Sequence, residues 1–354
     1  MVAQTAAIEN GKKMVDVENQ LSLINYLRDR GHLGASDRVE HHVLDGGVSN
    51  KTVLVRLPGG CEWVIKQALP RLRVASEWLS DPARVHREAA GMRALAQLAP
   101  AGSITQFAFE DFNEHILAMS AVAQPHENLK SLFLQGEVER KWIEQFATLL
   151  AAIHRRSYER REVLAGEFED RQFFQSLRVE PYYVYSAGVE LRAAPFYESL
   201  IASMSNRRFA LVHGDYSPKN VLVREGKLIL LDHEVIHWGD PAFDVGFSMA
   251  HLLSKAHHVR AARREFLEAA NLYQERYLQE IGNVPWREDI DEISVRHTLA
   301  CLLARVVGRS LLEYLTDEQR ERQRAAVVLL IQNPPRSLRR LIGTLDESIA
   351  ALER

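Results

Sequence analysis

One short segment in the middle of this 354-residue chain constrains its fold and chemistry more than any other. It reads HGDYSPKN, spans residues 213–220 and follows a short apolar run. Asp215 and Asn220 lie five residues apart in it, and Asp232 stands at the end of a second apolar run over 227–231. Apolar runs of this length predict buried strands, which deliver the three polar side chains into loops at their ends.

The spacing after this segment predicts a β-hairpin. Residues 221–223 suit one strand, 224–226 a tight turn and 227–231 the returning strand. Folding the hairpin brings Asn220 and Asp232 to the same end, where two hard oxygen ligands can face one Mg²⁺ ion. A carboxylate base with an amide oxygen and a second carboxylate as metal ligands is what phosphoryl transfer needs. The alternative is an ordinary hairpin with solvated Asp and Asn in its turns.

The segment and the residues after it resemble the aminoglycoside phosphotransferase and choline kinase superfamily, the small-molecule relatives of protein kinases. That family has H-G-D, then N, then D, and a G-D-P-x-x-D-[LV] tail, which is GDPAFDV over 239–245 here. The resemblance covers roughly residues 35–330. Gly214 stands where protein kinases usually carry Arg, and only eleven residues separate Asp232 from Asp244. That is too short for a regulated loop and a peptide platform, so a protein kinase is disfavoured.

The resemblance implies a role for each residue of the motif. Asp215 is expected to be the catalytic base, and Asn220 and Asp232 are expected to hold Mg²⁺. His213 and Asp244 are expected to brace the catalytic loop. ATP is the implied phosphoryl donor, and the implied partner is a small molecule that offers a hydroxyl group.

The implied fold is α+β, a bilobed protein-kinase-like architecture. Residues 1–122 are expected to form the ATP-binding lobe, with a small antiparallel sheet, one key helix and a further helix at the N-terminus. Residues 123–354 are expected to form a larger, mainly helical lobe that carries the catalytic and substrate sites. Helical patterns after the hairpin support this division, and one of them is predicted over 289–315.

Two glycines indicate where the phosphates of ATP would lie. Gly46 and Gly47 occupy the turn between strands predicted over 39–44 and 52–57. Glycines let a hairpin tip approach phosphates without a side-chain clash, and backbone N–H groups together with Ser49 can donate to them. A plain hairpin turn is the alternative.

A lysine, a glutamate and a hinge complete the predicted nucleotide site. Lys66 follows three apolar residues in the next predicted strand, where the kinase pattern has the lysine that pairs with ATP phosphates. Its predicted partner is Glu88 on the following helix, and Glu77 is the alternative. By resemblance, backbone groups near Ser120 to Val122 would read the edge of the adenine ring.

Composition agrees with an enzyme that works in the cytoplasm. A hydrophobic content of 46% supports sizeable cores, and a net charge of -3 offers no electrostatic case for nucleic acid or membrane partners. Cys61 and Cys301 are too few for a disulfide framework, which suits a reducing compartment. No apolar run approaches the roughly 20 residues that a membrane span requires.

The acceptor is less well defined by the sequence. Residues 171–196 carry an aromatic cluster, which either forms a box for a quaternary amine or a sugar face, or packs in the core. Residues 151–210 hold eight acidic residues and nine arginines, and residues 255–264 are basic. Arg305 and Arg309 are expected to share one helix face, where they bind an anionic group or pair with acidic side chains.

These charges favour a neutral or anionic hydroxylated metabolite over a polycation. The sequence therefore predicts a small-molecule kinase that uses Mg-ATP. An aminoglycoside kinase and a choline or amino-alcohol kinase are the closest alternatives. A non-catalytic ATP-binding protein is also possible, but it would be expected to lose Asp215 or a metal ligand, and none is lost.

Overall fold

The computed structural model describes residues 15–44, 47–73 and 78–354, and these residues form two compact units. The first unit comprises the described residues up to His86 together with Phe107–Ala121. The second comprises Arg87–Gln106 and Val122–Arg354. Arg87–Gln106 therefore belongs with the second unit although it precedes part of the first in the chain.

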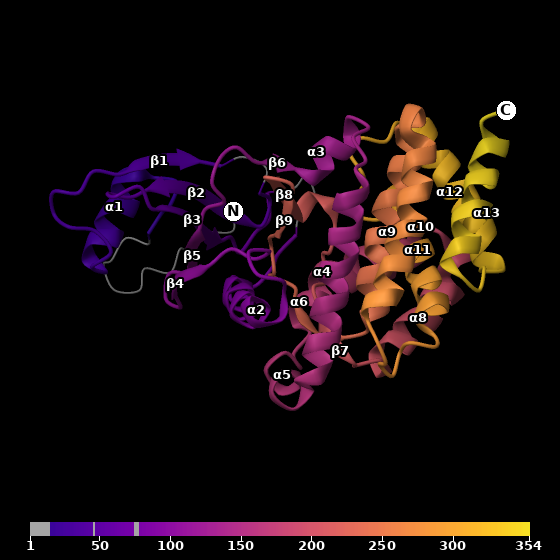
Figure 1. Cartoon of the computed structure of the whole chain (residues 1–354), viewed down its shortest axis with the longest axis horizontal. Helices are drawn as coiled ribbons and strands as arrows, with labels where there is room; N and C mark the ends of the chain where they lie inside the picture. Colours follow the sequence, from indigo (N-terminus) through magenta and orange to yellow (C-terminus); the bar gives the residue numbers. More distant parts are fainter. Residues whose placement is uncertain (1–14, 45–46, 74–77) are drawn as a thin grey trace, which may run out of the picture. The chain divides into compact units, whose positions relative to one another are not determined.

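The first unit is built on a five-stranded antiparallel sheet with strand order β1-β2-β3-β5-β4 (Figure 1). Val53, Val55 and Ile65 are buried on one face, where they form a core with residues of helix α1 (Gln20–Asp29). Alternation of buried and exposed residues along a strand produces such a one-sided core. The strands are β1 (Glu40–Val43), β2 (Asn50–Arg56), β3 (Glu62–Ala68), β4 (Phe107–Asp111) and β5 (Ile116–Ser120).

Helix α2 (Arg84–Leu98) begins in the first unit and continues into the second. The buried side chain of Arg84 anchors its start by donating to the carbonyl oxygens of Leu69 (2.9 Å) and Asp81 (3.1 Å). Further along, in the part of the helix that belongs to the second unit, Gly91 allows a close approach to Ile236, because a Cβ there would lie 2.9 Å from its Cγ2.

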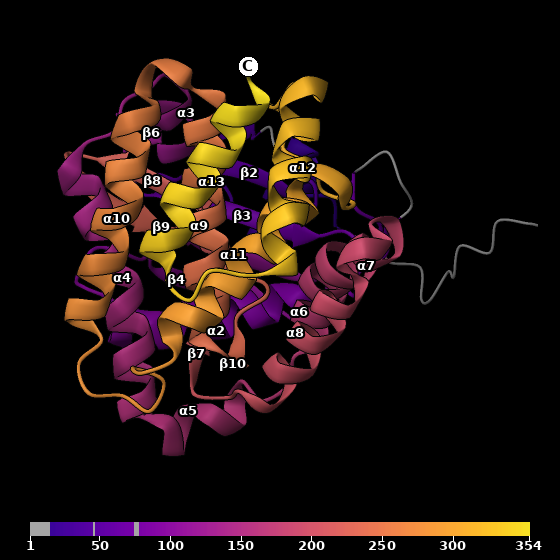
Figure 2. The ribbon, with the colours of Figure 1, turned by 90° about the vertical axis from the view of Figure 1, so that its right-hand side faces the viewer.

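The second unit is mainly helical, with α4, α10, α9 and α11 packed side by side and α12 and α13 packed over them, toward the viewer in Figure 2. Asp240 starts α9 by accepting a hydrogen bond from the backbone N–H of Ala242 (3.1 Å), and Pro241 occupies the first turn. The α-helices are α3 (Leu129–Leu134), α4 (Arg140–Glu159), α5 (Arg161–Glu167), α6 (Gln172–Phe174), α7 (Tyr185–Val189), α8 (Ala194–Asn206), α9 (Pro241–His258), α10 (Arg263–Glu280), α11 (Ile290–Val307), α12 (Asp317–Gln332) and α13 (Leu338–Leu352).

Two small sheets and four short helical segments complete this unit. Strand β7 pairs with β10, and β6, β8 and β9 form a three-stranded sheet. The strands are β6 (Glu127–Asn128), β7 (Ala210–Val212), β8 (Val221–Arg224), β9 (Lys227–Leu230) and β10 (His237–Gly239). The short segments are a π-helix, η1 (Gln175–Val184), and the 3-10 turns η2 (Leu191–Ala193), η3 (Pro218–Asn220) and η4 (Arg260–Ala262).

The helix predicted over 289–315 is wrong only in its last eight residues, because α11 ends at Val307. Gly308 leaves the helix in an extended conformation, and a Cβ at this position would lie 2.4 Å from the carbonyl oxygen of Ala304. Arg305 is therefore helical and Arg309 lies beyond the helix, so the two arginines do not share a helix face. Among residues 15–44, 47–73 and 78–354, no helix is both long enough and apolar enough to cross a membrane.

Candidate active site

A tight hairpin brings the predicted metal ligands together. Strands β8 and β9 pair directly, and Glu225 and Gly226 make the turn with φ of 52° and 73°. At the open end of the hairpin, the backbone N–H of Leu231 donates to the carbonyl oxygen of Asn220 (2.9 Å). Asp232 follows with a φ of 66°, an unusual backbone conformation for a residue other than glycine. Asn220 and Asp232 thus lie at the same end of the hairpin, as the sequence predicts.

Asp215 lies in the loop after β7 and is largely buried. Its carboxylate oxygen Oδ2 pairs with Nη2 of Arg178 (2.8 Å) and accepts a hydrogen bond from Nδ2 of Asn220 (2.7 Å). Both of these contacts use the same oxygen atom. Within the described part of the chain, no side-chain hydrogen bond or ion pair uses the other oxygen, Oδ1.

The side chain of Asn220 makes its hydrogen bonds through its amide nitrogen. Its Nδ2 donates to the backbone oxygen of Asp215 (3.0 Å) as well as to the carboxylate. Oδ1 of Asn220 and the carboxylate of Asp232 are hard oxygen donors, which fit Mg²⁺. No group of three or more His, Cys, Asp or Glu side chains that could hold a metal occurs in the described residues. A pair of protein ligands suits an ion that also takes phosphate oxygens and water.

Asp244, on α9, holds the backbone of the catalytic loop. Its carboxylate accepts hydrogen bonds from the backbone N–H groups of His213 (2.7 Å) and Gly214 (2.8 Å), and from Nε2 of His154 (3.2 Å). Burial alone would raise the pKa of Asp244, but these partners, with His154 foremost, hold it below its usual value. The prediction that His213 and Asp244 brace the loop is confirmed.

His213 is held in one tautomer by its neighbours. The backbone N–H of Asp215 can only donate, and it points to Nδ1 of His213 (3.2 Å). Nε2 therefore carries the hydrogen, which it offers to the carbonyl oxygen of Leu231 (3.2 Å) and to Nδ1 of His233 (3.1 Å). Burial lowers the pKa of His213, so the ring stays neutral near pH 7. The ring thereby links the catalytic loop to the end of the hairpin.

Gly214 needs to be glycine for two reasons. Its φ is 77°, and a Cβ would lie 3.0 Å from the carbonyl oxygen of Val235. The guanidinium group that protein kinases place at this position instead comes from Arg178 on η1, which donates to the carbonyl oxygen of Gly214 (2.9 Å) and pairs with Asp215. Burial would lower the pKa of Arg178, but Asp215 and other nearby carboxylates raise it above its ordinary value.

Arg178 is the active-site residue that the sequence did not single out. It is one of nine arginines between residues 151 and 210. It lies about forty residues before Asp215, and nothing in its local pattern marks it. Only the path of the π-helix η1 through the second unit brings it to the catalytic loop.

The first unit carries part of the predicted nucleotide site. Lys66 lies in β3, half-buried, opposite Thr52 of β2 and Leu117 of β5. Ser120 ends β5 opposite Trp63. The roles predicted for both residues stay predictions.

The other predicted nucleotide residues are divided between the two units. Gly47 and Ser49 precede β2, and the Oγ of Ser49 accepts a hydrogen bond from Nδ2 of Asn50 (3.1 Å). Glu88 is fully buried on α2 and belongs, like Val122, to the second unit. The predicted Lys66–Glu88 pair stays a prediction, and Gly46 and Glu77 lie outside the described residues.

The aromatic cluster over 171–196 is mostly core. Phe174 stacks on the ring of His237 with centroids 3.9 Å apart, and the hydroxyl group of the buried Tyr183 contacts Nδ1 of His297 (2.8 Å). The ring of Tyr182 has the guanidinium carbons of two arginines within 6 Å of its centroid, at 5.9 Å for Arg178 and 5.5 Å for Arg305. The core-packing alternative is thus confirmed for Phe174 and Tyr183, and the protein's own cations already lie against Tyr182.

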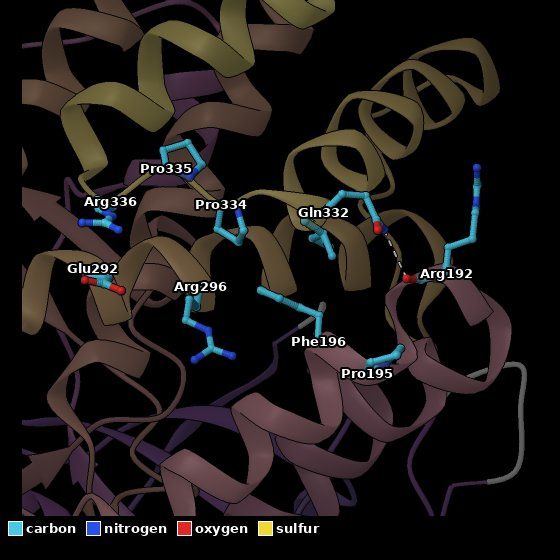
Figure 3. A pocket seen from close by; sticks show the side chains of 10 residues that line it. Arg192, Pro195, Phe196, Glu292, Arg296, Gln332, Pro334, Pro335 and Arg336 are labelled. Atoms are coloured by element: carbon cyan, nitrogen blue, oxygen red, sulfur yellow. Dashed lines mark hydrogen bonds between the residues drawn. The ribbon is translucent and has the colours of Figure 1, made fainter.

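A pocket of about 460 Å³ lies on the second unit (Figure 3). None of its lining residues belongs to the catalytic loop or to its hairpin. Its lining residues are Arg192, Pro195, Phe196, Glu292, Arg296, Ile331, Gln332, Pro334, Pro335 and Arg336. Nε2 of Gln332 donates to the backbone oxygen of Arg192 (3.3 Å) across one end of it.

Comparison with known proteins points to one family. Residues 40–288 match the model of the phosphotransferase enzyme family. A search of curated proteins found no match.

Solved structures with related folds act on different acceptors. An amicoumacin kinase solved with AMP-PNP and Ca²⁺ is 11% identical, with 92% of this chain and 98% of that chain covered and a TM-score of 0.56. An ethanolamine kinase from Plasmodium vivax is 12% identical, with 95% and 89% covered and a TM-score of 0.54. A type I macrolide 2'-phosphotransferase is 18% identical, with 96% and 99% covered and a TM-score of 0.50. The predicted kinase-like α+β fold is confirmed by these similarities.

Proposed function

The chain belongs to the phosphotransferase enzyme family, and from that premise we propose that it transfers the γ-phosphate of Mg-ATP to a hydroxyl group of a small metabolite. The family match confirms the resemblance to the aminoglycoside phosphotransferase and choline kinase superfamily. The observation that carries the proposal is the carboxylate of Asp215, which has one oxygen bound by Arg178 and Asn220 and the other left for an acceptor.

The proposed reaction uses Asp215 as its base. Oδ1 takes the proton of the acceptor hydroxyl as that oxygen attacks the γ-phosphorus, and ADP leaves with the electrons of the broken P–O bond. Arg178 and Asn220 keep the carboxylate oriented throughout. The amide oxygen of Asn220 and the carboxylate of Asp232 would hold Mg²⁺, which when bound neutralises charge on the phosphates.

In the proposed function, ATP is bound by the residues that the sequence analysis predicted for it. Phosphates would lie against the glycine turn and Lys66, with Glu88 orienting the lysine and the hinge from Ser120 to Val122 reading the adenine. The amicoumacin kinase was solved with AMP-PNP, which supports an adenine nucleotide for this fold. A cytoplasmic location fits this chemistry, since ATP is abundant there and both cysteines are free thiols.

The direct test measures ADP release from Mg-ATP against a panel of hydroxylated acceptors, with EDTA as the metal-free control. We expect Asp215→Asn to lose about 10²- to 10⁴-fold in turnover while ATP affinity changes only a few-fold, because a general base acts on the acceptor and not on the nucleotide. Asp29→Asn, at the exposed end of α1, is the matched control and should behave as wild type. Near-normal turnover by Asp215→Asn would remove this residue from the proposed role.

A further inference from the structure

A chain of side-chain contacts leads from the catalytic base to a second polar cluster inside the same unit. Arg178, which pairs with Asp215, lies against the ring of Tyr182. The hydroxyl group of Tyr182 accepts a hydrogen bond from Nη1 of Arg305 on α11 (2.8 Å). The same nitrogen donates to the backbone oxygen of Ser310 (2.6 Å) and to its Oγ (2.7 Å). Arg305 therefore stands two side chains away from the base.

A fully buried lysine belongs to this cluster. Lys255 on α9 has an exposed fraction of 0%, and its Nζ has one weak hydrogen bond, to the carbonyl oxygen of His251 (3.5 Å). Nζ also lies 5.2 Å from the ring centroid of Tyr314. His251 is itself buried, one turn earlier on α9.

The cations of this cluster are bound by neutral groups. In the part of the chain that the structure describes, no carboxylate lies within 4.0 Å of the charged nitrogens of Arg305 or Lys255. Glu313, the nearby carboxylate, pairs with another cation, Lys130. Nε of Arg305 and the hydroxyl group of Tyr314 are shielded from solvent and have no hydrogen-bond partner among the described residues.

Such a cluster is unfavourable as it stands. Charges taken out of water are normally paired, because desolvation costs several kcal/mol for each unpaired ion. Burial, together with the positive charges of Lys130 and Arg305, lowers the pKa of Lys255 to about 7. Burial and the charge of Lys255 likewise hold the pKa of His251 well below its ordinary value. An anion would relieve this repulsion and would find donors whose hydrogen bonds are unused.

We infer that this cluster is an anion subsite, so that the acceptor carries a carboxylate or phosphate group bound at Arg305 while its hydroxyl lies at Asp215. The inference rests on the proposed function, because it names the class of acceptor for that reaction. Arg305 supplies a permanent positive charge and, with Tyr314, the donors, and a bound anion would favour the protonated form of the buried Lys255. The same cations would repel an amino alcohol or an aminoglycoside at this position.

Matched acceptor series test this without any mutation. Glycerol, glycerate and glycerol 3-phosphate share one hydroxylated skeleton, and glucose, gluconate and glucose 6-phosphate share another. Titration calorimetry with Mg²⁺ and AMP-PNP present should show about tenfold or tighter binding of at least one anionic member over its neutral parent, as expected for charge-assisted hydrogen bonds. The carboxylate and phosphate arms separate the two sources of charge. The inference is overturned if no anionic member binds more tightly than its parent.

Variants of Arg305 then test whether this residue causes the preference for anionic acceptors. Arg305→Met should abolish the preference for the anion and raise KM for the anionic acceptor, with little change in ATP affinity. Arg309→Met is the matched control, since this arginine lies beyond α11 and pairs with Glu180 (3.2 Å). Arg305→Lys keeps the charge and should keep part of the preference, which separates anion binding from the structural bonds to Ser310. An Arg305→Met variant that is folded by circular dichroism and retains the full preference contradicts the assignment.

Failure of the proposed function would look different. In that case the enzyme would form no ADP with any acceptor, and it would not bind Mg-ATP. If only this inference fails, the enzyme still forms ADP with neutral or cationic acceptors. The Arg305→Met variant then forms ADP at the same rate as the wild type.

Discussion

At the scale of single residues, the two carboxylate oxygens of Asp215 have different surroundings. Two donors, Arg178 and Asn220, bind one oxygen of its carboxylate, and in the proposed reaction the other oxygen takes the proton of the acceptor hydroxyl. The loop that carries it is held by Asp244 through two backbone N–H groups. A base that is fixed before the substrate arrives needs no reorganisation during the reaction, which is how positioned groups accelerate proton transfer.

The metal site gives a prediction at the same scale. Asp232→Ala should remove the Mg²⁺-dependent part of ATP affinity, because Mg²⁺ of this kind is held jointly by carboxylate and phosphate oxygens. Isothermal titration of ATP with Mg²⁺ and with EDTA measures that difference. The control is Asp317→Ala, whose side chain is 97% exposed and pairs with Arg320 on the surface. Equal ATP affinity of the wild type with Mg²⁺ and with EDTA would refute the metal assignment.

At the scale of elements, the contact between α9 and α11 supports the site. Gly246 lies two residues after Asp244, at the point where α9 meets His297 and Thr298 of α11. A Cβ there would lie 2.4 Å from Cβ of His297 and 2.8 Å from the backbone nitrogen of Thr298. The two helices can approach this closely only because residue 246 has no side chain.

Gly246→Ala should therefore lower the free energy of unfolding by about 1 to 3 kcal/mol or more, since one added carbon forces the two helices apart. Urea unfolding followed by circular dichroism measures the change. Gly343→Ala on α13 is the control: nothing lies within 4 Å of its added Cβ, and the better helix propensity should be neutral or stabilising by up to about 1 kcal/mol. If both variants lose the same stability, close helix packing at Gly246 is not the reason.

At the scale of the whole molecule, charge distribution matters more than net charge. The chain has a net charge of -3, yet Lys130, Lys255 and Arg305 gather in one unit with Glu313 as their nearby carboxylate. A polycation would gain no Coulomb attraction at such a place, whereas an anion would.

We therefore expect that expressing this protein in a sensitive bacterium leaves the inhibitory concentration of kanamycin-type aminoglycosides unchanged. The measurement is the inhibitory concentration of several such drugs, with wild type and Asp215→Asn expressed at equal levels. A large rise with the wild type that disappears with Asp215→Asn would show that a cationic acceptor does fit.

The sequence by itself determined the catalytic loop and the hairpin after it. Asp215, Asn220 and Asp232 are close in the chain, and short strands with a tight turn place them together by local geometry alone. The strands of the first unit and most helices could be predicted for the same reason, because apolar periodicity is a local property.

Only the tertiary structure decided which distant side chains join that local motif. Arg178 reaches Asp215 through a π-helix, and Lys255 and Arg305 come to one cluster from separate helices. The end of α11, by contrast, has a local signal, because Gly308 directly follows the last helical residue. The physical reason is that those long-range contacts depend on helix packing between segments far apart in the chain, which leaves no periodic or local signature.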